Sequence, residues 1–206
     1  MSVTTNEEKE TKIELSEQGF RAILEAFTVE KHIDQLNVYY DSNWSLARRA
    51  VTCRVRFSRG EAPLACLKVP NSSSDSNTRS AKEIETRIGN GNAWHIRASA
   101  HRCVSADDDL PSAFCDELRA LGVSRLERAG WVRNRRYVMS ILDLGKFELD
   151  RLELPNGHVV FEAEIECTDD DVRDQIARRV RSIDPSATAS KLSKFQRFWH
   201  AAADER

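Results

Sequence analysis

The stretch that decides the fold lies near the start of the chain and reads EKETKIE from Glu8 to Glu14. In a β-strand successive side chains point to opposite faces, so Glu8, Glu10 and Lys12 share one face with Glu14. Glu8 and Glu10 would then lie roughly 6 to 7 Å apart. That spacing suits one or two hard cations, with Lys12 placed to bind an anion beside them. In a helix, Glu8 and Lys12 would form only a solvated ion pair. This stretch alone leaves both interpretations open.

The composition is that of a globular chain without a strong overall electric field. The chain has 206 residues, of which 31% are charged and 40% hydrophobic, and its formal net charge is −2. Because no linker or internal repeat divides it, we expect a single domain over 1–206. The near-neutral charge gives no general attraction for nucleic acid, and we expect no such partner.

The sequence also predicts the compartment and the state of the cysteines. No apolar run is long enough for a signal peptide or a transmembrane helix, so we expect a cytoplasmic protein with no membrane partner. The five cysteines form no CxxC pair, and the five histidines show no HExxH spacing. We therefore expect reduced cysteines that mostly pack in the interior, and no zinc site.

Alternation of charged and apolar residues marks at least five strands. The clearest run is 51–57, where Arg54 and Arg56 alternate with apolar side chains. A turn at 155–157, Pro-Asn-Gly, predicts a hairpin between the last two long strands. The alternation predicts that each strand carries its charges on one face, and the further residues assigned to that face are Lys68, Glu83, Glu85, Arg133, Arg135, Asp143, Glu164 and Glu166.

Amphipathic helices are the second kind of element that the sequence predicts. One follows the N-cap candidate Ser16, one lies between Pro111 and Gly122, one begins at a capping box opened by Thr168, and one covers 193–203. Each helix needs an apolar surface to pack on. If the helices cover the apolar faces of the strands, the charged faces either meet water on an open sheet or turn inward in a closed barrel.

The arrangement of like charges favours the inward alternative. Arg54 and Arg56 crowd together on one strand, and Glu83 and Glu85 do so on another, which stabilises neither strand. Such clusters are explained if basic residues bind a polyphosphate and acidic residues bind the Mg²⁺ or Mn²⁺ that bridges it. An ordinary solvent-facing surface of mixed charge is the alternative.

The ordered series of motifs resembles the CYTH domains, which are also called triphosphate tunnel metalloenzymes. Residues 8–12 are similar to the ExExK signature of that family, residues 39–42 (Tyr-Tyr-Asp-Ser) to its YYDT segment, and residues 54–56 to its paired arginines. The rest of the series follows in the family's order, as Lys68, Glu83-Ile84-Glu85, Arg133-Asn134-Arg135, Asp143 and Glu164-Ile165-Glu166. The resemblance covers about residues 8 to 195.

The resemblance implies an α+β fold, in which a closed antiparallel β-barrel of about eight strands forms a tunnel with helices packed outside. It implies that Mg²⁺ or Mn²⁺ is held by Glu8, Glu10, Glu164 and Glu166, and that the catalytic residues are Glu10, Glu166 and Lys12. It assigns the phosphate chain to Lys12, Arg54, Arg56, Lys68, Arg133, Arg135 and Lys191. It gives supporting roles to Glu83, Glu85 and Asp143. Lys194 is a second candidate for the lysine that related proteins place near the phosphates.

The expected activity is metal-dependent hydrolysis of the terminal phosphoanhydride of a triphosphate. Inorganic tripolyphosphate is the first choice, because thiamine triphosphate or a nucleoside triphosphate needs a stacking platform such as Trp44, Trp94 or Trp199. An adenylyl cyclase is an alternative, although the cyclases of this family tend to carry a His-Phe pair where this chain has Thr5-Asn6-Glu7. A non-catalytic polyphosphate or nucleotide sensor is another, but binding an anion alone would not need the full set of carboxylates.

Overall fold

The computed structural model describes residues 4–7, 10–70, 81–87, 103–105, 112–190 and 192–203. Within these ranges, all eleven strands belong to one antiparallel sheet, in the order β1-β6-β5-β4-β3-β8-β9-β10-β2-β11, with β7 paired to β8. The strands are β1 (Thr4–Glu7), β2 (Glu10–Leu15), β3 (Thr28–Asp41), β4 (Thr52–Ser58), β5 (Leu64–Pro70), β6 (Ala81–Arg87), β7 (Cys103–Ser105), β8 (Arg125–Ile141), β9 (Gly145–Glu153), β10 (Val159–Glu166) and β11 (Thr188–Ala189). The helices are α1 (Glu17–Ala26), α2 (Ser112–Ala120), α3 (Asp170–Ile183) and α4 (Lys194–Ala203), with a 3-10 turn, η1, at Ala47–Arg49.

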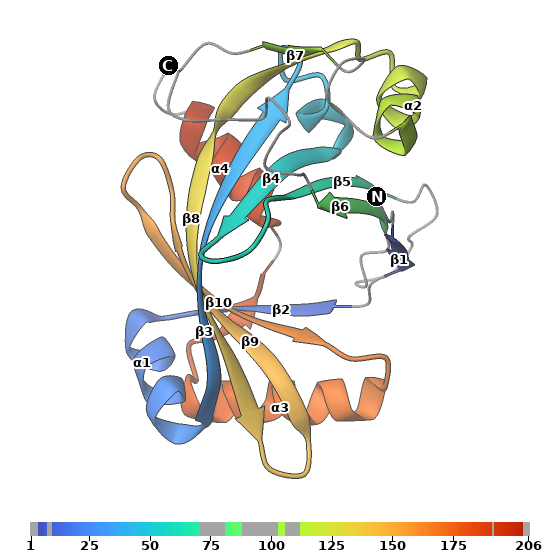
Figure 1. Ribbon diagram of the computed structural model, residues 1–206. Coiled ribbons are helices and arrows are strands. Elements are labelled where there is room, and N and C mark those ends of the chain that lie inside the picture. The colour runs from blue at the N-terminus through green and yellow to red at the C-terminus, as the bar shows by residue number, and fades with distance from the viewer. Residues whose placement is uncertain are drawn as a thin grey trace.

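Two long strands, β3 and β8, form the spine of the molecule (Figure 1). They pair from Thr28 opposite Ser140 to Asp41 opposite Glu127. In Figure 1 the strands β4, β5 and β6 leave the upper part of this spine, whereas β2, β9 and β10 lie below. The sheet is therefore divided into an upper and a lower half that share the same two strands.

The predicted α+β class is confirmed, but closure of the sheet into a barrel is not. The strand order has two ends, β1 and β11, and no pairing joins them in the part of the chain that the structure describes. The strands β1 and β2 are neighbours in sequence, yet β1 pairs with β6 of the upper half and β2 with β10 of the lower half. The start of the chain therefore contributes to both halves.

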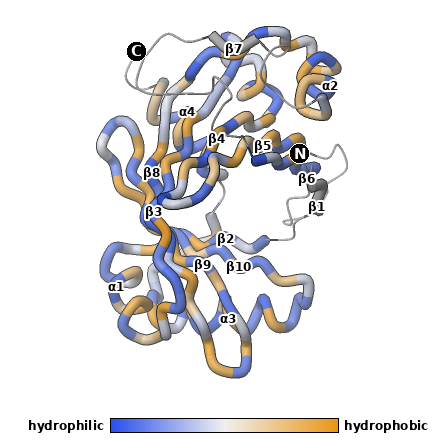
Figure 2. The backbone as a smooth tube through the Cα atoms, viewed as in Figure 1, coloured by the Kyte–Doolittle hydropathy of each residue, from blue (hydrophilic) through white to orange (hydrophobic). Residues whose placement is uncertain are grey.

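The helices cover apolar faces of the sheet, as the sequence predicted. On the lower half, Phe20 and Ile23 of α1 and Ile176 of α3 pack in one core with Ile13 and Ile165. On the upper half, α2 covers β4, β5 and β6 in a second core. Figure 2 shows hydrophilic and hydrophobic residues alternating along the strands. Since one face of each strand is buried under helices, the other is left for charged groups.

The predicted local signals hold with one correction. Ser16 caps α1, because its side chain accepts a hydrogen bond from the Gly19 amide, and Gly157 takes the positive φ of the hairpin turn. The residue that caps α3 is Asp169 and not Thr168, since the Asp169 carboxylate accepts from two amides of the first turn. A carboxylate is favoured there by the positive end of the helix dipole.

The last helix, α4, is anchored to the spine by Phe198. Its ring is fully buried and stacks on Tyr39 of β3 with centroids 4.9 Å apart. Gly130 of β8 allows this close approach, because a Cβ there would lie 2.5 Å from the Phe198 ring. The anchored ring fixes the start of α4, which carries Lys194.

We predict that Phe198→Ala lowers the free energy of unfolding by about 3 to 5 kcal/mol, the usual effect of removing a buried ring. Urea denaturation measures the loss. Leu142→Ala, at a side chain that is 87% exposed, is the control and should change stability by less than about 0.5 kcal/mol. Equal effects of the two substitutions would contradict this packing.

Candidate functional site

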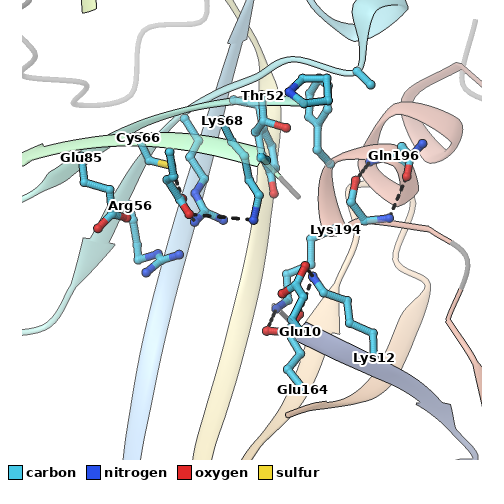
Figure 3. Close-up of a pocket in the computed structure, with 18 of the residues that line it drawn as sticks. Glu10, Lys12, Thr52, Arg56, Cys66, Lys68, Glu85, Glu164, Lys194 and Gln196 are labelled. Carbon is cyan, nitrogen blue, oxygen red and sulfur yellow. Dashed lines mark hydrogen bonds and ion pairs between the residues drawn. The ribbon is translucent and has the colours of Figure 1, made fainter. Parts of the chain in front are cut away.

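A cavity of about 510 Å³ lies between the two halves of the sheet. In Figure 3, Arg56, Lys68 and Glu85 lie on one side of this cavity, and Glu10 and Lys12 on the other. Its charged lining comes from seven strands and α4, and comprises Glu10, Lys12, Arg54, Arg56, Lys68, Glu83, Glu85, Arg136, Glu148, Glu164, Glu166 and Lys194. The structure thus brings together most of the site residues that the sequence predicted.

The upper wall of the cavity is rich in cations. Arg54 and Arg56 of β4 face it, as does Lys68 of β5. Glu83 lies 3.6 Å from Arg54 Nη2 and 3.8 Å from Lys68 Nζ, which is longer than a hydrogen bond. The proximity of Arg54 lowers the pKa of Arg56, and burial and Arg136 lower it further. The depressed pKa reports crowded positive charge, which an anion would relieve.

Cys66 belongs to the same wall and was not predicted from the sequence. Its thiol donates a hydrogen bond of 2.6 Å to Glu83 Oε1. Burial raises the pKa of this thiol to about 12. The thiol is therefore a neutral hydrogen-bond donor that orients Glu83 beneath the arginines.

The lower wall is rich in carboxylates. Cross-strand pairing places Glu10 opposite Glu166 and Lys12 opposite Glu164. One oxygen from each of Glu10, Glu164 and Glu166 lies within 4.8 Å of the others, a spacing that could hold a metal ion. Burial raises the pKa of Glu166, and the neighbouring Glu164 and Glu10 raise it further. This mutual repulsion is what a divalent cation would neutralise.

Lys12 forms ion pairs with two carboxylates of that cluster, Glu10 and Glu164. Its Nζ lies 2.8 Å from Glu164 Oε1 and 3.2 Å from Glu10 Oε1. Although burial opposes it, these two carboxylates hold the pKa of Lys12 above its usual value. Lys12 therefore stays charged at the floor of the cavity.

A buried ionic network supports the lower wall from behind. Arg136 of β8 donates to Asp150 of β9 through Nε and Nη2, at 2.9 and 2.8 Å, and also pairs with Glu148. Lys194 of α4 lies 2.7 Å from both Asp150 and Glu164. Burial opposes ionisation of Asp150, but Lys194 and Arg136 hold its pKa below the usual value.

Glu148 behaves differently from the other carboxyls of the network. Burial raises its pKa to about 7; Arg136 opposes this rise, whereas Asp150 and Glu164 add to it. Glu148, Asp150 and Glu164 form a second group of carboxylates spaced to hold a metal ion. The cavity therefore contains one carboxyl that changes charge near neutral pH.

The structure corrects the prediction of which β8 side chains face the cavity. Arg133 and Arg135 do not line the cavity; they are exposed on the opposite face of the sheet, whereas Asn134 and Arg136 face inward. The prediction failed because residues 133–136 read Arg-Asn-Arg-Arg, so both faces of the strand carry arginine. The inward choice follows from Asp150, the buried carboxylate directly opposite Arg136 in the β8–β9 register.

Asp143 is also misplaced by the sequence prediction. It is exposed in the tight turn between β8 and β9, where its φ is +66°, and it does not line the cavity. Glu8 and Lys191 lie outside the described residues. Of the three tryptophans considered as platforms, Trp44 and Trp199 pack against the core around Phe198, and Trp94 is not described.

Comparison with known proteins identifies the family and supports the fold. Residues 6–199 match the sequence model of the CYTH domain, so the chain belongs to the CYTH family. No curated protein matches it by sequence. Among the described residues, no helix is both long enough and apolar enough to cross a bilayer.

Solved structures of similar fold include one from Hippeastrum and one from Bacillus halodurans. One is HpAC1 from Hippeastrum, a candidate adenylyl cyclase with a dominant triphosphatase activity, which is 22% identical with a TM-score of 0.72 and covers 94% of this chain and 95% of its own. The other is a candidate adenylate cyclase from Bacillus halodurans, 20% identical with a TM-score of 0.74, covering 95% of this chain and 98% of its own. At these identities the likeness is one of fold.

Arg136→Met should lower the free energy of unfolding by about 3 to 5 kcal/mol, because it leaves buried carboxylates without their partner. Arg133→Met, on the outer face, should change it by less than about 1 kcal/mol. Thermal or chemical denaturation distinguishes the two. Comparable losses would contradict the assignment of faces on β8.

Mn²⁺ affinity, measured by titration calorimetry, should fall as the pH drops through about 7, because Glu148 takes up a proton there and loses the negative charge that attracts the cation. The limiting slope for one linked proton is about tenfold per pH unit. Glu148→Gln should flatten this dependence. Glu153→Gln, on the outer face, should retain it, and an unchanged slope in Glu148→Gln would refute the linkage.

Proposed function

We propose that this protein is a divalent-metal-dependent triphosphatase that hydrolyses the terminal phosphoanhydride of a triphosphate. The observation that carries the proposal is the division of charge within one cavity. Arg54, Arg56 and Lys68 face it from the upper half, and Glu10, Glu164 and Glu166 from the lower half. A phosphate chain that bridges a metal ion needs both kinds of wall at once. The activity named for HpAC1 supports the same choice.

The acidic wall fits Mg²⁺ or Mn²⁺. Its donors are carboxylate oxygens, the ligands that these hard cations prefer. Glu10, Glu164 and Glu166 would hold the ion, with Glu148 and Asp150 beside them. Such an ion would supply charge stabilisation for the phosphate oxygens and lower the pKa of water.

The chain's own cations would bind and orient the substrate. Arg54 and Arg56 present fork-shaped guanidinium groups that suit two-point contact with phosphate oxygens. Lys68 and Lys12 would extend this grip toward the carboxylates. Arg136 and Lys194 would act differently, since they contact Asp150 and Glu164 and hold the acidic wall in place. Alignment and charge neutralisation of this kind account for most phosphoryl-transfer catalysis.

In this proposal the sheet encloses the triphosphate as a tunnel within a single domain. β1, at one end of the strand order, and β2, next to the other end, belong to opposite halves and are adjacent in the chain. A ligand that is bound by both walls would draw these halves together.

Inorganic tripolyphosphate is the substrate we propose. A nucleoside or thiamine triphosphate would need an exposed aromatic platform. Two aromatic residues line the described cavity, Tyr39 and Phe195, and their side chains are only 1% and 4% exposed. The charged lining needs nothing further to bind a bare phosphate chain.

Glu10→Gln should reduce phosphate release from tripolyphosphate by about 10²-fold or more, the usual effect of losing one group that stabilises transition-state charge. Its melting temperature should stay close to that of the wild type. Glu17→Gln, at an exposed position of α1, is the matched control and should keep full activity.

A panel of tripolyphosphate, thiamine triphosphate, ATP and pyrophosphate with Mg²⁺ or Mn²⁺ identifies the substrate. Phosphate release that is fastest from tripolyphosphate is the expected result. Formation of cyclic AMP from ATP would replace the proposal by a cyclase. Tight binding without turnover would replace it by a sensor.

A further inference from the structure

A second hollow lies on the outer face of the sheet, where β3, β4, β8 and β9 meet. Its volume is about 490 Å³, which falls within the range of roughly 300 to 1,000 Å³ that is usual for small-molecule sites. Leu36 and Phe57 give it an apolar part. We call it the arginine hollow, after its charged lining of Asp34, Arg59, Arg133, Arg135, Arg151 and Glu153.

The charges of the arginine hollow do not balance. Four arginines against two carboxylates leave a surplus of two positive charges, although the whole chain has a net charge of −2. The surplus is therefore local to this face. It includes Arg133 and Arg135, the two arginines that the sequence assigned to the cavity and that the structure places outside.

The carboxylates present satisfy the arginines only in part. Asp34 Oδ1 accepts a hydrogen bond of 3.1 Å from Arg135 Nε. Glu153 is divided between two arginines, 3.6 Å from Arg133 Nη1 and 3.9 Å from Arg151 Nη1. Both of these distances exceed a hydrogen bond. A guanidinium has five N–H donors, so most of those of Arg133 and Arg151 can donate to the oxygens of a ligand.

Strand register places two of the arginines in direct opposition. Arg135 of β8 is the cross-strand partner of Arg151 of β9. Like charges opposite each other on one face of a sheet are destabilising. An anion bound between the two guanidinium groups would replace this repulsion with two favourable contacts. Arg133 stands beside them with its guanidinium 5.1 Å from the Trp131 ring centre, a contact that holds it in place.

We propose that the arginine hollow binds a small ligand carrying at least two negative charges on adjacent phosphate groups, held between Arg135 and Arg151. Pairs of guanidinium groups match phosphate oxygens by two-point hydrogen bonding. Two charges balance the surplus, and joined phosphates carry them in a volume that fits the hollow. The concave shape favours a small molecule over an extended macromolecular surface. The proposal does not depend on the activity proposed for the cavity.

The arginine hollow is also connected to the cavity through the sheet. Asn134 lies between the two outward arginines and contributes to the lining of the hollow, while its buried side chain faces the interior of the sheet. Its Nδ2 donates to Gln35 Oε1 at 3.3 Å and to Asp150 Oδ1 at 3.0 Å. Asp150 in turn pairs with Arg136 and Lys194 of the cavity. A ligand in the hollow would therefore lie one side chain away from the network that supports the acidic wall.

Protection of arginines from phenylglyoxal, read by mass spectrometry of peptides, tests the proposal. The probe is pyrophosphate in the presence of EDTA, with the full chain. Arg135 and Arg151 should be modified severalfold more slowly when pyrophosphate is present, whereas the exposed Arg178 of α3 should be modified at the same rate. Equal rates for all three with and without pyrophosphate would overturn the proposal. So would equal protection by sodium chloride at matched ionic strength, which would reveal screening alone.

Titration calorimetry with pyrophosphate gives an independent test. The wild type should show two binding events, and Arg135→Ala/Arg151→Ala should retain only the one that belongs to the cavity. The matched control is Arg178→Ala/Arg181→Ala, which removes the same charge from α3 and should keep both events. A single event in all three proteins would contradict the proposal. Hydrolysis by the hollow variant should stay close to wild type, so failure of the triphosphatase proposal is recognised separately.

Discussion

The structure depends on one buried carboxylate, Glu164. Its side chain is only 3% exposed, and it contacts Lys12 at 2.8 Å, Arg136 at 2.6 Å and Lys194 at 2.7 Å. Although burial opposes ionisation, these three cations hold the pKa of Glu164 well below its usual value. A buried carboxylate without partners would cost several kcal/mol of stability, so each contact is needed. Removing one partner of a buried ion pair typically lowers the free energy of unfolding by roughly 3 to 5 kcal/mol. Because the cations come from β2, β8 and α4, the same side chain fixes three elements relative to β10.

The two walls of the cavity divide its chemistry. The upper wall gathers Arg54, Arg56 and Lys68, and Glu83 lies 3.6 Å from Arg54 and 3.8 Å from Lys68. The lower wall gathers more carboxylate than its cations neutralise, as the raised pKa values of Glu148 and Glu166 indicate. Burial and neighbouring carboxylates cause both rises. The strands β3 and β8 connect the two walls, and this explains how a chain of nearly neutral charge can concentrate both signs in one place.

The sequence predicts the faces of strands well where charge alternates with apolar residues. The β4 arginines and the β2 and β10 glutamates were placed in one cavity for this reason, because Cys53, Val55 and Ile165 can only face a core. The sequence-based prediction fails on β8, where arginine occupies both faces and only the pairing with β9 decides which arginines face the cavity. Glu148 and Asp150 carried a usable signal, since they alternate with Phe147 and Leu149, but no face was assigned to that strand.

Other features could not be read from local sequence because they depend on tertiary contacts. Lys194 reaches the lower wall only because Phe198 anchors α4 beside Gly130. The surplus of arginine on the outer face likewise depends on the β8–β9 register, which pairs Arg135 with Arg151. Whether the sheet closes into a barrel also depends on tertiary contacts. The sequences of β1 and β2 do not determine how these two strands lie relative to each other.

The most direct test of this account is anomalous diffraction from crystals soaked with Mn²⁺ and tripolyphosphate. The account predicts a manganese peak against Glu10, Glu164 and Glu166, with the phosphate chain reaching from that ion to Arg54 and Arg56. A manganese ion bound away from these carboxylates, or a phosphate chain that avoids the β4 arginines, would contradict it.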